Sequence, residues 1–216
     1  MLRYPELLAW EMLWTDSLRE TYAAIYQKAK QVNSSLGVGW HIWHNNSFNP
    51  IYRAEQDLAE ISKHSDFLKI VIYHNCAGER MANYIDHVHE SIYGDVPKQE
   101  LLDFHYRVLD YREKTLAEIP ESGFSSDYVF RETKRARAGL ANSSTKLWPG
   151  IDIDIPTAPN HSKSTPEGTR QAVLAAIRGG ADGVLLSRKY SEMKLANLRG
   201  AGAALRESSW AKTEKA

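Results

Sequence analysis

The stretch WPGIDIDIP, residues 148–156, alternates isoleucine with aspartate between two prolines. Successive side chains of a strand point to opposite faces, so the isoleucines share one face and the aspartates share the other. In a two-layer protein these aspartates would face water. In a parallel barrel wrapped by helices they would face the barrel axis, where a carboxylate is costly to bury without a partner or a chemical role. Asp154 ends this strand before a Pro-containing loop, which is where such barrels keep their catalytic groups.

Length and composition indicate one globular domain over residues 1–216. Lys plus Arg and Asp plus Glu each number 27, so no net charge attracts nucleic acid or an anionic membrane. A single cysteine, Cys76, excludes an internal disulfide framework and a Cys-based zinc site. The sequence has no bilayer-spanning apolar run and no signal-peptide pattern at Met1. A cytoplasmic location is therefore the default expectation, and an exported one applies if the N-terminus is truncated.

Hydrophobic periodicity predicts alternating strands and helices. Strands are expected near residues 37–44, 67–75, 148–155 and 183–188. Helices are expected near residues 5–32, 51–64, 79–91, 98–117, 127–138, 166–178 and 191–207, with a frayed tail at 208–216. This alternation is typical of βαβ units and a parallel sheet.

We predict an α/β fold of the (β/α)8 TIM-barrel type, represented by its C-terminal half. Gly37-Val38-Gly39 precedes its strand, so the Gly-rich turn of a doubly wound dinucleotide fold is missing. About four parallel strands are half of an eight-stranded barrel. The open edges of such a sheet invite association. We therefore expect either a missing N-terminal half of the barrel or a homodimer of half-barrels.

Polar and aromatic residues gather at the expected ends of the first two strands. His41, Trp43 and Asn45 share one face of the first strand, and Tyr73 and Asn75 share one face of the second. A sugar ring stacks its apolar face on an aromatic side chain, and its hydroxyls need paired donors and acceptors. These five residues are therefore predicted to bind a carbohydrate.

A pair of carboxylates is expected across the mouth of the barrel. Asp154 ends the third strand, and Glu192 follows the fourth. Glycoside cleavage needs one group that protonates the departing oxygen and a second that attacks or activates water. We assign these roles to Asp154 and Glu192, and place Asp152 behind them as a supporting substrate-site residue. Lys69 is expected to form a buried ion pair with Asp152.

Two other kinds of site are more weakly indicated. Arg188 and Lys189 follow the fourth strand, where barrels often bind phosphate, but the usual Gly-rich turn is missing. Asp152, Asp154 and two histidines, His41 and His161, are oxygen and nitrogen donors that suit a metal ion. None of these four residues lies in an HxH or HExxH spacing, so neither a metal nor a cofactor is expected.

Four blocks carry a resemblance to a known group: VGWHIWHNNSF (38–48), SDFLKIVIYHNCAGERMANYI (65–85), WPGIDIDIP (148–156) and GADGVLLSRKYSEMKLANLRGAGAALRE (180–207). Together they resemble bacterial glycoside hydrolases and glycoside-hydrolase-like proteins with a (β/α)8 barrel, over nearly the whole chain. The resemblance implies a longer N-terminus, with a catalytic carboxylate of strand four before Arg3. It also implies a Glu at the end of strand five, where this chain has Trp43, Asn45 and their neighbours.

The sequence therefore predicts a glycoside-hydrolase-like protein that acts on a carbohydrate by carboxylate acid/base chemistry. The first alternative is a non-catalytic carbohydrate-binding barrel that keeps the aromatic residues without an acid/base pair. The second is a metal- or phosphate-dependent lyase or aldolase on the same fold, with Lys69 or Lys189 available for a Schiff base.

Overall fold

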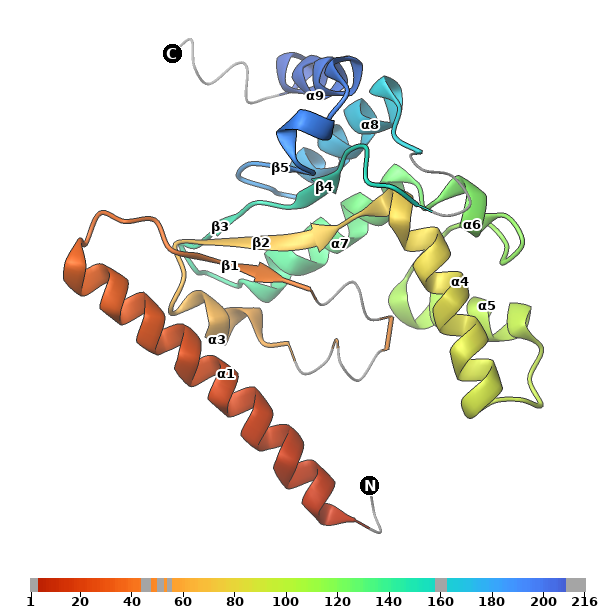
Figure 1. Cartoon of the computed structure of the whole chain (residues 1–216), viewed down its shortest axis with the longest axis horizontal. Coiled ribbons are helices and arrows are strands. Elements are labelled where there is room, and N and C mark those ends of the chain that lie inside the picture. Colours follow the sequence, from red (N-terminus) through yellow and green to blue (C-terminus); the bar gives the residue numbers. More distant parts are fainter. Residues whose placement is uncertain (1–3, 44–47, 50–52, 54–55, 158–162, 209–216) are drawn as a thin grey trace.

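The computed structural model of the chain describes residues 4–43, 48–49, 53, 56–157 and 163–208. Over these residues, helices alternate with strands that form one parallel sheet (Figure 1). The strands are β1 (Gly39–Ile42), β2 (Phe67–Ile72), β3 (Lys146–Leu147), β4 (Gly150–Asp152) and β5 (Leu185–Ser187). The helices are α1 (Pro5–Val32), α3 (Leu58–Ser62), α4 (His74–Ser91), α5 (Lys98–Leu109), α6 (Ile119–Ser122), α7 (Ser126–Gly139), α8 (Pro166–Arg178) and α9 (Leu195–Glu207), with a 3-10 turn η2 (Tyr190–Glu192) before α9.

The strands lie in the order β1-β2-β4-β5, and β3 also pairs with β2. All the pairings are parallel. Phe67 lies opposite Lys146 and Val71 lies opposite Gly150, so β3 and β4 keep the same register against β2. The strand predicted at 148–155 covers only residues 150–152, and a break at residues 148–149 separates it from β3, which was not predicted. The break includes Pro149, which has no N–H to donate to the ladder.

The end of β2 differs most from its prediction. The strand stops at Ile72 instead of residue 75, and α4 begins at His74 instead of residue 79. β1 and β5 are each shorter than predicted. Three of the predicted helices also change: α3 covers 58–62, α5 ends at Leu109 before the left-handed Asp110, and α9 begins at Leu195. Ser208 is buried at the end of α9, and the rest of the predicted tail lies outside the described residues.

One face of the sheet forms the main hydrophobic core with the helices. Ile42, Ile70, Ile72 and Ile151 are almost completely buried on this face. α7 packs against β2, and α8 packs against β4. α9 packs closely on α8, since a Cβ at Gly200 would lie 2.1 Å from the Pro166 carbonyl oxygen. Ile151 and Ile153 are therefore buried, as predicted, whereas Ile155 is only half-buried.

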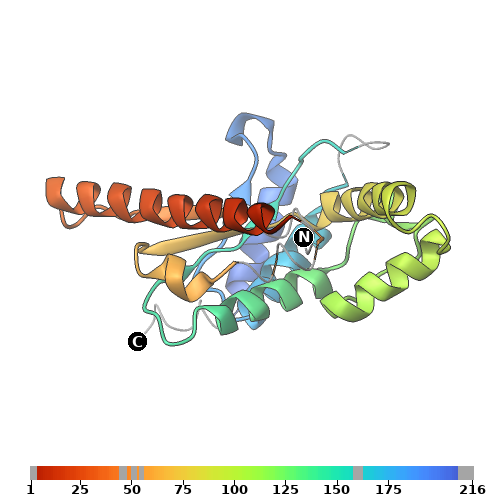
Figure 2. The same cartoon turned by 90° about the horizontal axis from the view of Figure 1, so that it is seen from below.

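Helix α1 contrasts with this core. Figures 1 and 2 show it running along the outside of the molecule past β1 and α3. None of its 28 residues is buried. Its C-terminal half is attached to the rest of the chain at two places. The Tyr22 ring stacks on Trp40 with ring centroids 4.3 Å apart, and two further side chains of the helix bind Asp66. The Asp66 carboxylate accepts hydrogen bonds from Tyr26 Oη at 3.0 Å and from Lys30 Nζ at 2.7 Å.

The described helices, α1 included, do not combine the length and apolar character that crossing a bilayer requires.

Candidate functional site

Asp152 is completely buried and lies at the N-terminus of α4. Its Oδ2 accepts hydrogen bonds from the backbone N–H of Asn75 at 3.0 Å and from Cys76 Sγ at 3.7 Å. His74 Nδ1 lies 2.7 Å from Asp152 Oδ1, although the two atoms are not aligned for a hydrogen bond. The N-cap residue of α4, Tyr73, supplies no side-chain cap. A helix N-terminus has unpaired N–H groups and a positive dipole end, so the carboxylate of β4 replaces the missing cap.

Cys76 takes part in this arrangement as a protonated thiol. Burial, and secondarily the charge of Asp152, raise the pKa of Cys76 to about 12. A thiol is nucleophilic only as the thiolate. Cys76 is therefore a hydrogen-bond donor to Asp152 and is unsuited to nucleophilic catalysis.

Asp154 connects the end of β4 to the start of α9. Its Oδ2 accepts the backbone N–H of Lys194 at 2.8 Å, and both carboxylate oxygens lie 3.0 Å from Asn197 Nδ2. Lys194 is the N-cap residue of α9 and supplies no side-chain cap. The backbone of Asp154 is left-handed, with φ 53°, a conformation that Asp tolerates better than most residues. Asp154 thus holds α9 against the sheet.

Ser164 joins the surroundings of the two aspartates. Its Oγ accepts the backbone N–H of Asp154 at 2.9 Å and Asn75 Nδ2 at 3.2 Å. We call Asn75, Asp152, Asp154, Ser164 and Asn197 the aspartate network. It brings together three of the residues that the sequence placed in the site. Asn75 enters it from the first turn of α4, not from the face of a strand as predicted.

Glu192 is held by neighbours of its own. It lies in η2, where its carboxylate pairs with Arg188 Nε at 2.5 Å and with Lys189 Nζ at 3.9 Å. Its side chain remains partly exposed. Asp154, the carboxylate predicted to act with Glu192, has a different ion-pair partner: Lys194 Nζ lies 3.6 Å from its Oδ1.

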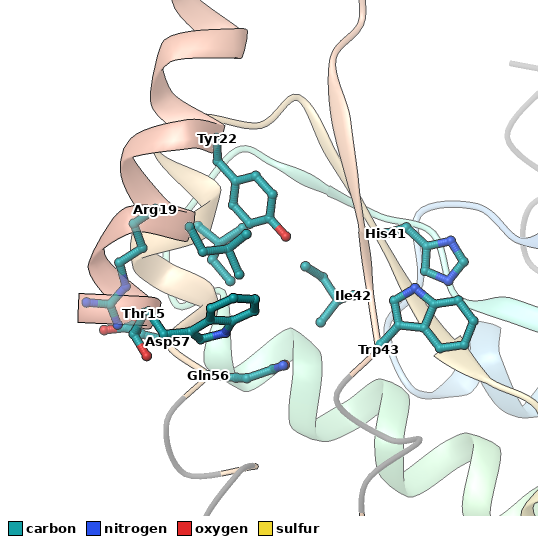
Figure 3. Close-up of a pocket in the computed structure, with 11 residues that line it drawn as sticks. Thr15, Arg19, Tyr22, His41, Ile42, Trp43, Gln56 and Asp57 are labelled. Carbon is teal, nitrogen blue, oxygen red and sulfur yellow. The ribbon is translucent and has the colours of Figure 1, made fainter. Parts of the chain in front are cut away.

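A second group of predicted residues lies on the sheet face opposite Ile42. His41 and Trp43 stack with ring centroids 4.8 Å apart and planes 7° from parallel. Figure 3 shows both rings on the side of β1 away from Tyr22 and α1. Lys69 pairs with His41 in the register of β1 and β2, and its Nζ lies 3.4 Å from Tyr73 Oη. We call His41, Trp43, Lys69 and Tyr73 the open-face cluster.

Gly150 makes room for the lysine of this cluster. A Cβ at Gly150 would lie 2.7 Å from Lys69 Cε, so the lysine side chain crosses β4 at this glycine. The ion pair of Lys69 with Asp152 predicted from the sequence is not among those of the described residues; the lysine amine lies near Tyr73 instead. Burial, followed by the charge of Lys69, lowers the pKa of His41. His41 is therefore a neutral imidazole at pH 7, with one donor and one acceptor.

A cavity of about 250 Å³ lies between α1, β1 and the segment before α3. Trp14, Leu18 and Tyr22 line it from α1; Ile42, the last residue of β1, and Trp43, which follows β1, line it on the other side. Figure 3 shows Ile42 pointing toward Tyr22 across this space. The cavity adjoins the open-face cluster at Trp43.

Sequence reasoning missed several members of the two groups. Alternation along β2 places Lys69 on the face of Tyr73, so its membership of the open-face cluster was available from the sequence. Ser164 and Asn197 carry no such signal, because a loop and a helix bring them to Asp154.

Two predicted residues, Asn45 and His161, lie outside the described part of the chain. Among the described residues, no group of three or more His, Cys, Asp or Glu side chains is arranged to hold a metal ion. Comparisons of the chain with protein-family models, with curated proteins and with solved structures found no match.

Proposed function

We propose that this protein is a glycoside-hydrolase-like half-barrel that binds a carbohydrate through the open-face cluster. The observation that carries the proposal is the position of Trp43. Its side chain is 55% exposed although its ring is held flat against His41. An aromatic ring fixed in one orientation with a face available is suited to stacking on the apolar face of a sugar.

The polar members of the cluster suit sugar hydroxyls. The neutral imidazole of His41 offers one donor and one acceptor, Lys69 offers an amine and Tyr73 offers a phenol. Binding sites of small molecules combine aromatic surface with a few convergent polar groups of this kind. Together the four side chains provide a stacking surface with donors and acceptors beside it.

The half-barrel part of the proposal is supported by the order of the strands. β1, β2, β4 and β5 are parallel and adjacent in the order in which they occur in the chain. A barrel requires this sequential order, whereas a doubly wound sheet reverses its order at the ligand-binding crevice. The helices α7 and α8 pack on the core face of the sheet, as the outer ring of helices does in a barrel.

Calorimetric titration with a panel of neutral and acidic oligosaccharides tests carbohydrate binding. We expect the wild-type chain to bind at least one of them and Trp43→Ala to bind it about tenfold more weakly, since one aromatic contact contributes about 1.4 kcal/mol. Tyr93→Ala removes an exposed aromatic side chain beyond the end of α4 and is expected to bind as wild type. A wild-type chain that binds no sugar of the panel, or a Trp43→Ala variant of unchanged affinity, contradicts the proposal.

Hydrolysis with Asp154 and Glu192 as the carboxylates is the second candidate function. The left-handed backbone of Asp154, two residues after β4, favours it, because residues in sparsely populated conformations cluster at functional sites. Release of reducing ends from a bound oligosaccharide measures this activity. We expect Asp154→Asn, which keeps the tolerance for a left-handed backbone, to abolish turnover while leaving the circular dichroism spectrum unchanged. Equal turnover by Asp154→Asn and wild type removes this assignment.

A further inference from the structure

Helix α1 exposes more apolar surface than a helix in water retains without a partner. Eight large apolar side chains on it are 42 to 65% exposed: Leu7, Leu8, Trp10, Met12, Leu13, Trp14, Leu18 and Ile25. Trp14 and Leu18 belong to the side that lines the cavity beside β1, and Leu8, Met12 and Leu13 extend the apolar surface around the helix. A helix that is apolar on more than one side is normally buried. The surface from residue 7 to residue 14 therefore requires a second covering element.

The area involved is large enough for a stable interface. A standard interface buries roughly 800 Å² on each partner. Eight large apolar side chains, each about half exposed, supply an area of that order on α1 alone. Contiguous apolar patches on soluble monomers are usually a few hundred Å².

The two edges of the sheet each lack a neighbouring strand. Within the described part of the chain, β1 and β5 are the edge strands, and each pairs on one side only. An open edge is a template for another strand. β1 is parallel to its neighbour β2, and β5 is parallel to its neighbour β4. All the strands therefore run in one direction, and β5 of one chain can pair in parallel with β1 of another. A second copy of the chain can supply a partner strand to both edges, with its β5 beside β1 and its β1 beside β5.

We propose that two copies of this chain associate about a twofold axis and pair β5 of each copy with β1 of the other. The same contact then forms twice, which closes the assembly and leaves no edge for further growth. α9 follows β5 and α1 precedes β1, so α9 of one copy comes to lie beside α1 of the other. Exposed Leu195 and Leu205 give α9 an apolar surface for this contact. The formal net charge of zero adds no overall repulsion between the copies.

This pairing also adds to the open-face cluster. η2 begins three residues after the end of β5, and Trp43 directly follows β1, so pairing β5 with β1 brings η2 of one copy near Trp43 of the other. η2 contains Tyr190, which is almost fully exposed in the single chain, and Glu192. An aromatic ring and a carboxylate from the second copy would then border the stacking surface of Trp43.

Sedimentation equilibrium on the full chain tests the association directly. We expect wild type to have twice the monomer mass of 24.5 kDa at micromolar concentration. The double variant Trp10→Glu with Leu13→Glu is expected to be a monomer, because each acid would be buried unpaired at the interface. Ile92→Glu is the matched control: Ile92 is 70% exposed just beyond α4, and this variant should remain a dimer. Circular dichroism and urea unfolding verify that each variant folds.

A second measurement tests the arrangement. Met12→Cys on α1 and Leu205→Cys on α9 are combined in one chain and oxidised under mild conditions. The native Cys76 is buried, so the new thiols dominate the reaction. We expect a disulfide-linked dimer from the double variant, and much less from either single variant. A monomeric wild type, an assembly larger than a dimer, or a dimer that keeps its mass in the double Glu variant overturns the proposal, whether or not the chain binds sugar.

Discussion

The aspartate network and the open-face cluster use polar residues in opposite ways. In the network, Asp152 and Asp154 are buried, and each carboxylate accepts donors from the start of a helix. In the cluster, Trp43 is held by stacking on His41 and keeps a large part of its surface in water. Asp152 ends a strand and Trp43 directly follows one, and both occur in sequence patterns that suggest a site.

The comparison shows why a carboxylate at a strand end is ambiguous. Parallel strands are followed by helices, so strand ends lie close to helix N-termini, where unpaired N–H groups and the helix dipole favour an anion. Asp152 and Asp154 meet this need for α4 and α9. An exposed, fixed aromatic ring fills no such structural need. Removing residues of the network should therefore lower stability, and removing residues of the cluster should not.

Asp152→Ala should produce the largest loss of stability. The substitution leaves the N–H of Asn75 buried without its charged acceptor and removes the cap of α4. Hydrogen bonds to charged groups contribute about 1.5 to 3 kcal/mol, so we expect the free energy of unfolding to fall by about 3 kcal/mol. Urea unfolding followed by circular dichroism measures it.

Asp152→Asn is the matched variant for this test. It keeps an acceptor for the N–H of Asn75 but removes the charge, so it should lose less stability than Asp152→Ala. A loss below about 1 kcal/mol for Asp152→Ala would mean that α4 does not depend on this cap and that the carboxylate is available for another role.

Asn197→Ala should have the next largest effect. Asn197 is buried in α9 and donates to both oxygens of Asp154 at 3.0 Å. Loss of this donor to a charged acceptor should lower the free energy of unfolding by about 2 kcal/mol. Asn142→Ala at an exposed position is the control and should be neutral. Equal stabilities of the two variants would place the attachment of α9 elsewhere, in its packing on α8.

The sequence predicted the parallel α/β architecture well, because periodicity follows from packing. Ile151 and Ile153 are buried as their alternation requires. The sequence-based prediction was wrong at the strand ends. His74 and Asn75 continue an apolar run that is typical of a strand, yet they begin α4. The cap of this helix comes from Asp152, which lies 77 residues after Asn75. A cap from another strand leaves no local signal. For the same reason the role of Asp154 in holding α9 was not apparent from its neighbours.

Trp43→Ala tests whether a residue of the open-face cluster contributes to stability. Because Trp43 is more than half exposed, we expect its removal to change the free energy of unfolding by no more than about 0.5 kcal/mol. Trp148→Ala is the contrasting variant. The Trp148 ring stacks on Phe67 at 4.3 Å and is less exposed, so its loss should cost clearly more. A Trp43→Ala variant as destabilised as Trp148→Ala would show that Trp43 has a structural role.

The smallest expected effect concerns the charge within the open-face cluster. Burial and Lys69 both lower the pKa of His41, so Lys69→Met should raise this pKa part of the way back toward its ordinary value. NMR titration of the imidazole protons measures it, and His41→Gln assigns the signal among the eight histidines. Lys98→Met removes a lysine of α5 that pairs with Asp86 on α4, and it should leave the His41 pKa unchanged.

The sign of the accompanying stability change follows from proton binding. With its pKa lowered in the folded chain, His41 binds fewer protons there than in the unfolded chain between the folded pKa and about 6.5. Stability therefore rises with pH through this window, and Lys69→Met should make that rise smaller. An unchanged His41 pKa in Lys69→Met would mean that the lysine amine lies too far from the imidazole to affect it. The two side chains would then not converge on one ligand, and the hydroxyl-binding role of Lys69 would be lost while the stacking role of Trp43 remained.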